Sequence, residues 1–229
     1  MNTVNAIFTK QMKDMFRNIG VLALFVVFPI IALAMENLID VYGMEDGHFS
    51  SMMASMFIGM GLIMSTATIL AEDKETHSLK FLTIAGVKPM SYMIGIGGVL
   101  FIASIITSVA FGLIGAVDAS YFIRFMAIML SGTIAGILLG GIIGLASNNV
   151  QSATGLTMPI GMALGLLPMV ASFNDQIARF TQFIFTQQVS DMLADHTMDI
   201  GRPLLIIGAN IAVLAIVFAI AYAKNGKAK

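Results

Sequence analysis

Side chains that could carry chemistry are few in this sequence, and most of them gather in one stretch. The three histidines stand apart at His48, His77 and His196, and no G-x-S-x-G, H-E-x-x-H or G-x-x-x-x-G-K-[ST] pattern occurs. His196 has Asp195 and Asp199 nearby, which is a weak metal-binding pattern, and an accidental grouping in an acidic loop is the favoured interpretation. We therefore expect neither catalysis nor a cofactor in this chain.

The densest polar stretch is A-E-D-K-E-T-H-S-L-K-F-L, from Ala71 to Leu82, between two long apolar segments. Placing the four charges that precede Leu79 in hydrocarbon costs roughly 2.5–3.5 kcal/mol each at a helix centre, so the stretch must lie in water. Helix-forming residues fill most positions, and Leu79 and Leu82 recur at helical spacing. The pattern predicts a short helix over residues 72–85 that lies against a membrane and is suited to docking.

The composition around this stretch is that of an integral membrane protein. Hydrophobic residues make up 58% of the chain and charged residues only 11%, against roughly 25% charged in a soluble domain. The net charge of −1 gives no field that would attract nucleic acid, so no such partner is expected. The absence of cysteine excludes disulfides and thiol sites. We predict an all-α membrane protein that forms a single transmembrane domain over residues 1–229.

Six apolar segments are long enough to cross a bilayer as helices. An amphipathic stretch over residues 3–17 precedes the first and predicts a helix in the membrane interface. Residues 173–202 are too polar to cross and too apolar to float free, so we expect one or two short helices in the outer leaflet, where anchoring and gating are both open. The predicted spans are residues 19–35, 52–70, 92–117, 121–146, 154–171 and 204–223.

Positive charge predicts the orientation of these spans. Nine Lys and Arg residues fall on the side of both termini and the 72–85 helix, and three fall on the other side. Cytoplasmic loops are enriched in Lys and Arg, so both termini should lie in the cytoplasm, and the acidic loop of residues 36–50 should face out. The nine are Lys10, Lys13, Arg17, Lys74, Lys80, Lys88, Lys224, Lys227 and Lys229, and the three are Arg124, Arg179 and Arg202.

Glycine recurs at every fourth position of the fourth span. Small residues on one stripe let helix backbones approach closely, so this face should pack on another helix. Packing within the chain is the commoner outcome, and packing on a second copy stays open. The stripe consists of Gly132, Gly136, Gly140 and Gly144.

A few polar side chains inside the spans could line a substrate path. Ser65, Thr66 and Thr68 approach the cytoplasmic end of the second span, and Asn210 lies deep in the sixth. Hydroxyls in membrane helices often bond back to the preceding turn, and a lone amide often joins two helices. These structural roles are favoured over transport roles.

This layout resembles the membrane subunit of ABC-2-type transporters. The stretch from Ala71 to Leu82, followed by Gly86-Val87-Lys88-Pro89-Met90-Ser91-Tyr92, is similar to that family's A-E-E-K-E-x-G-T-L-E-x-L…P-V-S pattern. Lys13-Asp14-Met15-Phe16-Arg17-Asn18, leading into the span with Pro29, is similar to the family's entry pattern. The resemblance covers nearly the whole chain at the level of layout.

The resemblance implies a permease subunit of an exporter in the plasma membrane of a bacterium. The 72–85 helix would be a coupling helix that docks on a separate cytosolic ATPase, which would hold the ATP and Mg²⁺, and a second permease copy or a paralogue would complete the route. The cargo would be hydrophobic or amphipathic, such as a peptide, lipid or drug. The implied docking contacts are Glu72, Glu75, Thr76, Leu79 and Leu82.

Two alternatives from other classes remain. A stand-alone carrier or channel driven by an ion gradient could use unwound backbone near Pro159 and Pro168. A non-transporting immunity or assembly protein of the membrane would show no ATP-linked flux.

Overall fold

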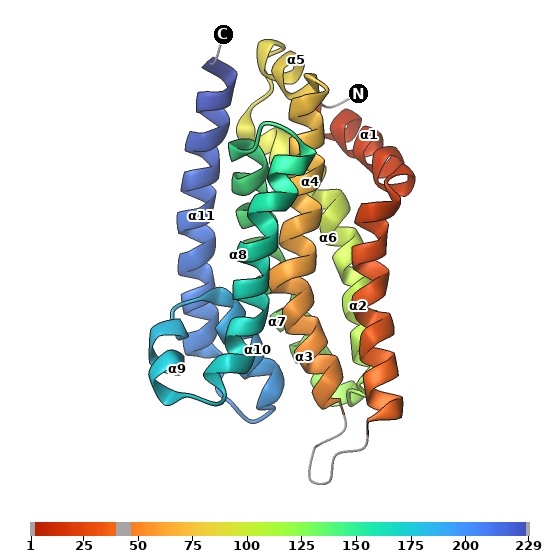
Figure 1. The fold of residues 1–229 in the computed structure, drawn as a ribbon, viewed down its shortest axis with the longest axis vertical. Coiled ribbons are helices and arrows are strands. Elements are labelled where there is room, and N and C mark those ends of the chain that lie inside the picture. The colour runs from red at the N-terminus through yellow and green to blue at the C-terminus, as the bar shows by residue number, and fades with distance from the viewer. Residues whose placement is uncertain (1–2, 40–46, 228–229) are drawn as a thin grey trace.

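Long apolar helices that run from one end of the molecule to the other dominate the computed structural model, which describes residues 3–39 and 47–227 (Figure 1). No strand occurs in these residues, and six helical segments are long and apolar enough to cross a membrane. The prediction of an all-helical protein with six spans is confirmed at this level. The six are α2 (Ile19–Leu38), α3–η1–α4 (His48–Glu75), α6 (Pro89–Ile114), α7 (Ala119–Ala146), α8 (Val150–Ala171) and α11 (Gly201–Lys227).

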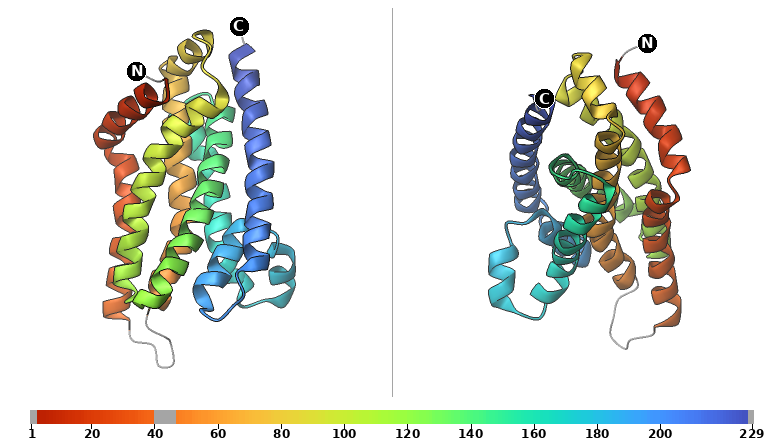
Figure 2. Two further views of the ribbon diagram at one scale, coloured as in Figure 1. Left: turned by 180° about the vertical axis from the view of Figure 1, so that it is seen from behind. Right: turned by 45° about the horizontal axis from the view of Figure 1, so that its top comes forward.

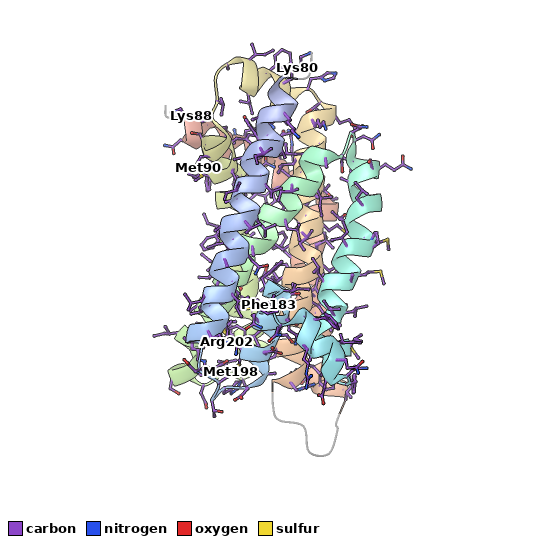
Figure 3. All side chains as sticks on the ribbon, turned by 90° about the vertical axis from the view of Figure 1, so that its left-hand side faces the viewer. Lys80, Lys88, Met90, Phe183, Met198 and Arg202 are labelled. Atoms are coloured by element: carbon purple, nitrogen blue, oxygen red, sulfur yellow. The ribbon has the colours of Figure 1, made fainter. Side chains whose placement is uncertain are left out.

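Short elements divide the molecule into two different ends (Figures 1 and 2). The terminal end holds α1 (Thr3–Arg17), α5 (Ser78–Ile84) and the last turns of α11. The cap end holds α9 (Asp175–Thr181) and α10 (Phe185–Ala194). Lys80 and Lys88 lie at the terminal end, and Phe183, Met198 and Arg202 lie toward the cap end (Figure 3). Residues 40–46 of the acidic loop, with Asp40, Glu45 and Asp46, lie outside the described residues, as does Lys229.

The second span is the central helix of the bundle. It runs as α3 (His48–Met56), a π-helical turn η1 (Phe57–Gly61) and α4 (Leu62–Glu75). In its apolar 18-residue stretch, 78% of the residues are buried inside the bundle. It contacts α2, α6, α7 and α8. It extends beyond the predicted range of 52–70 at both ends. The extension past Leu70 occurs because the charged residues there find partners on neighbouring helices.

The glycine stripe of α7 faces this central helix. A Cβ atom placed on Gly140 would lie 2.5 Å from the carbonyl oxygen of Ile63 and 2.7 Å from Cβ of Thr66. The other three stripe glycines face residues of η1 and α4 in the same way. The close approach that the stripe allows is therefore made within one chain.

The cap end consists of two short helices, in the region where the sequence predicted one or two. The apolar side of α10 is buried against α3, α7, α8 and α11. The segment around α9 instead exposes large aromatic side chains: Phe173, Phe180 and Phe183 are 81%, 84% and 62% exposed. This part of the cap presents an aromatic surface at the side of the molecule.

Candidate functional site

The last turn of α4 carries four consecutive charges that bond to five neighbouring elements. We call Glu72, Asp73, Lys74 and Glu75 the charged hub. Their partners lie on α1, the α1–α2 junction, α6, the end of α7 and the start of α8. Because all five bonds start from one helical turn, a displacement of this turn acts on five elements at once.

Asp73 is the buried member of the hub, with only 5% of its surface exposed. One carboxylate oxygen accepts from Nζ of Lys10 on α1, and the other accepts from the hydroxyl of Tyr92 on α6 at 2.9 Å. Burial lowers the pKa of Lys10, but the hydrogen bond and charge of Asp73, together with Asp14, outweigh burial and leave this pKa raised. The expectation that all four charges lie in water is therefore wrong for Asp73, since a cation and a hydroxyl replace its water.

Lys74 and Glu75 complement two helix ends of opposite polarity. Nζ of Lys74 donates to the carbonyl of Leu145, in the last turn of α7, at 2.8 Å. A carboxylate oxygen of Glu75 accepts from the backbone N–H of Val150, the first residue of α8, at 3.0 Å. A cation at a helix C-terminus and an anion at an N-terminus both oppose the helix dipole favourably. Glu75 therefore fastens the start of α8.

Glu72 holds the junction between α1 and α2. Its carboxylate accepts from Nδ2 of Asn18 at 3.2 Å, and Oδ1 of the same Asn18 caps α2 by accepting from the N–H of Val21 at 3.1 Å. Asn18 thus joins the interfacial helix, the first span and the hub. Glu72 and Glu75 are exposed as well as bonded, so they also remain within reach of a partner.

The predicted helix over residues 72–85 is divided in two. The helix of the second span continues through Glu75, a turn follows in which His77 has a positive φ of 59°, and α5 begins at Ser78. The turn is closed by the hydroxyl of Thr76, which donates to the carbonyl of Glu72 at 2.8 Å. The sequence did not predict this break, because every residue in it is compatible with a helix. What interrupts the helix is the left-handed backbone conformation of His77.

The face of α5 that points outward is not the face that the sequence predicted for docking. Leu79 is 4% exposed and belongs to the core, and Leu82 is half-buried against it. The apolar side chains that face outward are Phe81 and Ile84, which are 70% and 73% exposed. Of the predicted contacts, Glu72, Glu75 and Thr76 are exposed, whereas Leu79 supports α5 from inside.

The loop after α5 is attached to the last span. The hydroxyl of Tyr222 on α11 donates to the carbonyl of Val87 at 3.2 Å, and its ring lies 5.4 Å from that of Tyr92. Through Tyr92 this contact continues to Asp73. α5 and the loop that follows it are thereby connected to the hub on both sides.

The predicted path residues have structural contacts. Ser65 and Thr66 donate to the carbonyls of Gly61 and Leu62, each at 2.8 Å, and both are buried, whereas Thr68 is half-buried. Asn210 donates to the carbonyl of Phe183 at 2.9 Å and so joins α11 to the loop between α9 and α10. The structure does not bring these four residues together.

A cavity of about 520 Å³ lies at the cap end, between α3, α8 and α10. Its lining is mixed, since Met52, Pro168 and Phe173 share it with His48, Ser190 and His196. His196 stacks on Tyr121 with ring centroids 4.1 Å apart. The described residues contain no group of His and carboxylate side chains able to hold a metal ion.

Two contacts, those of Asp73 and Asn149, were not predicted from the sequence, although a sequence pattern indicates each of them. Asp73 lies three and four residues after the buried Leu70 and Ile69, so a continued helix places it on the core face. Asn149 precedes a helical pattern and accepts from the N–H of Ser152 at 2.8 Å. This N-cap explains why the fifth span starts at Val150 and not at the predicted residue 154.

Comparisons with known proteins agree with this architecture. A search of curated proteins found no match. The family model of the ABC-2 family transporter protein matches residues 36–223, which hold five of the six spans, the charged hub and both cap helices. The chain therefore belongs to the ABC-2 family of transporter proteins.

Proposed function

We propose that this chain is the permease subunit of an ATP-driven exporter, and that a separate cytosolic ATPase drives it through α5 and the charged hub. The chain itself would have no enzymatic activity and would hold no cofactor, while ATP and Mg²⁺ would bind to the partner. The observation that carries the proposal is the hub: one turn of the central helix, next to an exposed apolar docking segment, bonds to five elements of the membrane domain.

The mechanism transfers a movement of the ATPase to the spans. The partner would grip α5 at Phe81 and Ile84 and contact the exposed carboxylates of Glu72 and Glu75. Because α5 follows the hub after a two-residue turn, a push on α5 displaces the end of α4 and, through its bonds, the ends of α1, α6, α7 and α8. ATP can move this assembly only by binding one arrangement more tightly than the other.

The cargo we propose is hydrophobic or amphipathic, such as a peptide, a lipid or a drug. The cavity at the cap end supports this class, because it offers methionine and aromatic surface beside histidine and serine side chains. Its position at the end opposite α5 suits a site from which cargo leaves after the ATPase has acted.

The complete transporter would contain two permease chains, either two copies or this chain and a paralogue, in the plasma membrane of a bacterium. Both termini and α5 would face the cytoplasm. The excess of Lys and Arg at the terminal end supports this orientation.

Single cysteines test the orientation and the docking surface together, since the chain has no cysteine of its own. We expect Phe81→Cys to resist a membrane-impermeant maleimide in intact cells and to react after lysis, whereas Phe180→Cys, also exposed but at the cap end, should react in intact cells. A bifunctional reagent on Phe81→Cys should then capture an ATPase, and the same reagent on Phe180→Cys should not.

Transport assays complete the test. Ile84→Asp should abolish ATP-linked export and ATPase capture, with Phe180→Asp as the control at the other end. Export that persists in Ile84→Asp, or labelling of Phe81→Cys from outside, would refute the docking proposal. Flux through vesicles that contain this chain alone would favour the stand-alone carrier.

A further inference from the structure

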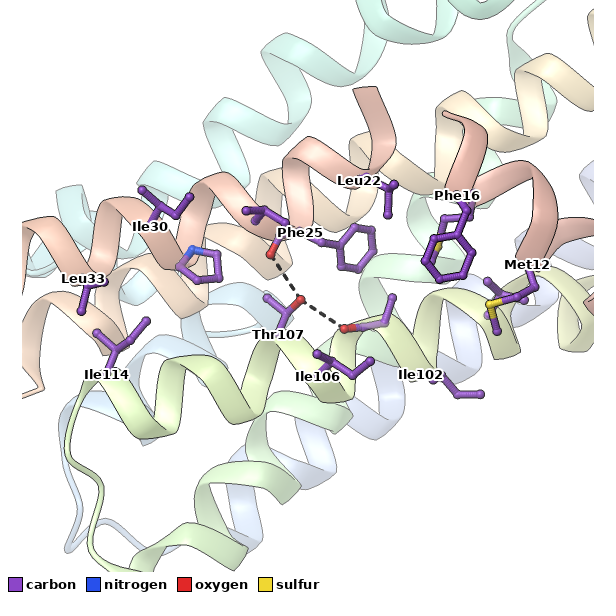
Figure 4. Close-up of a pocket in the computed structure, with 15 residues that line it drawn as sticks. Met12, Phe16, Leu22, Phe25, Ile30, Leu33, Ile102, Ile106, Thr107 and Ile114 are labelled. Atoms are coloured by element: carbon purple, nitrogen blue, oxygen red, sulfur yellow. Dashed lines mark hydrogen bonds between the residues drawn. The ribbon is translucent and has the colours of Figure 1, made fainter. Parts of the chain in front are cut away.

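An apolar groove of about 570 Å³ runs along the outside of the bundle between α2 and α6, and α1 crosses it at the terminal end of the molecule, at the right in Figure 4. It is lined from Met12 and Phe16 at the terminal end to Leu33 and Ile114 toward the cap end. Neither the hub nor the cavity at the cap end shares a lining residue with it.

The interior of the groove suits hydrocarbon and no polar group. Pro29 lacks an N–H, which leaves the carbonyl of Phe25 without its helical donor. The hydroxyl of Thr107, the polar side chain of the lining, lies 3.4 Å from that carbonyl and 3.1 Å from the carbonyl of Ala103 (Figure 4). Because this hydroxyl is engaged by backbone oxygens, an occupant meets only apolar surface.

The end of the groove at α1 differs from its interior, because two cations flank it. Lys13 and Arg17 each follow a lining residue, Met12 or Phe16, and lie one helical turn apart on the exposed face of α1. Among the described residues, no carboxylate lies within ion-pair distance of either cation, whereas Lys10 of the same helix pairs with Asp14 and Asp73. Two positive charges beside an apolar groove are complementary to an anionic lipid.

We propose that this groove binds an acyl chain of an anionic phospholipid, whose phosphate lies at Lys13 and Arg17. The lipid would fix α1 against α2 and α6, and α1 in turn holds Asp73 of the hub through Lys10. The proposal requires only that the chain spans a membrane, and it holds whether or not an ATPase docks on α5.

Tryptophan fluorescence provides the test, because the chain contains no tryptophan. Ile102→Trp places a single reporter in the groove, and Val213→Trp places a control on the exposed side of α11. The two positions are matched in depth, because Val213 is as many residues from the start of α11 at the cap end as Ile102 is from the end of α6 there. Each full-length variant is reconstituted in phosphatidylcholine vesicles that contain brominated phosphatidylglycerol or brominated phosphatidylcholine. Size-exclusion profiles confirm that the variants are folded, and Ile106→Trp repeats the measurement in case a tryptophan at position 102 fills the groove.

We expect brominated phosphatidylglycerol to bind at the groove reporter at least about fivefold more tightly than brominated phosphatidylcholine, since each nearby cation contributes roughly a factor of five. The control reporter should show no headgroup preference. Lys13→Gln with Arg17→Gln should remove the preference at Ile102→Trp without unfolding the chain. Equal quenching by both lipids would overturn the proposal, and so would weak quenching by any lipid, which would mean that a second protein copy covers the groove.

Discussion

The two ends of the molecule are fastened by different chemistry. At the terminal end, charged side chains of one helical turn reach out to five elements, and Asp73 bonds to side chains on two of them. At the cap end, side chains of the spans donate to backbone carbonyls of the cap: Tyr121 to Met192 at 3.0 Å, and Asn210 to Phe183 at 2.9 Å.

The bonds at the two ends differ in how easily they exchange partners. The exposed carboxylates of Glu72 and Glu75 can lose or exchange partners at little net cost, because water and salt compete for them, whereas the buried Asp73 cannot. The bonds of Tyr121 and Asn210 to backbone carbonyls depend on the path of the cap and on no particular cap side chain. We therefore expect the exposed bonds of the terminal end to rearrange more readily than those of the cap end.

The largest effect should come from breaking the contact between the central helix and α7, because both ends depend on it. We expect Gly140→Ala to destabilise the protein by roughly 1–3 kcal/mol, since the added methyl meets the backbone of α4 at 2.5 Å. Gly155→Ala is the matched control, because a methyl there has no atom within 4 Å. Thermal unfolding in detergent measures both, and equal midpoints would show that α4 and α7 are not packed as described.

The next effect sharpens the view of the terminal end. Asp73→Ala leaves the half-exposed Lys10 without its partner and Tyr92 without its acceptor, and should cost roughly 1–2 kcal/mol. Glu72→Ala removes an exposed carboxylate of the same turn and should stay within about 0.5 kcal/mol. Chemical denaturation of both variants gives the comparison, and a larger loss in Glu72→Ala would contradict the burial of Asp73.

A smaller and local effect tests the cap. Asn210→Ala removes the donor to Phe183 and should cost about 1 kcal/mol, and faster hydrogen exchange should be confined to α9 and α10. Asn37→Ala is the control, because the Asn37 amide donates to Leu33 within its own helix. Faster exchange throughout α11 in Asn210→Ala would mean that this amide stabilises the span and not the cap.

The smallest effect depends on pH. Burial raises the pKa of Asp191 on α10, although the hydrogen bond from Gln187 opposes the rise. A carboxyl with a raised folded pKa contributes stability below its unfolded pKa and loses it as pH rises through the folded pKa. Asp191→Asn should therefore raise the unfolding midpoint slightly at pH 7 and not at pH 4, as thermal scans at both values would show. An equal rise at the two pH values would point to packing and not to charge.

The spans and their order could be predicted from the sequence, because apolar length alone identifies a membrane helix. Helix ends could not, since they depend on partners distant in the chain. The second span continues to Glu75 because Lys10, Leu145 and Val150 supply bonds that hydropathy does not reveal.

The candidate site shows the same limit in finer detail. Charge density located the turn that holds the charged hub, but it could not separate Asp73, which is buried, from Glu72 and Glu75, which are exposed. Periodicity paired Leu79 with Leu82 correctly as one face of a helix, yet it could not tell whether that face meets a partner or the core. The outward face of α5, with Phe81 and Ile84, becomes identifiable only when the neighbouring helices are in place.

The π-helical turn η1 lies in the middle of the central helix, between the cap end and the charged hub. A π turn accommodates one residue more than an α-helical turn, and removing one residue from an α-helix rotates all that follows by about 100°. Deleting a single amino acid from Phe57–Gly61 would thus wind the segment into a regular α-helix and leave Glu72 to Glu75 in phase with the elements that they bond, whereas a deletion within residues 62–71 would turn them out of phase. Those five residues are therefore the place in the central helix where a change of length by one residue is tolerated without moving the charged hub.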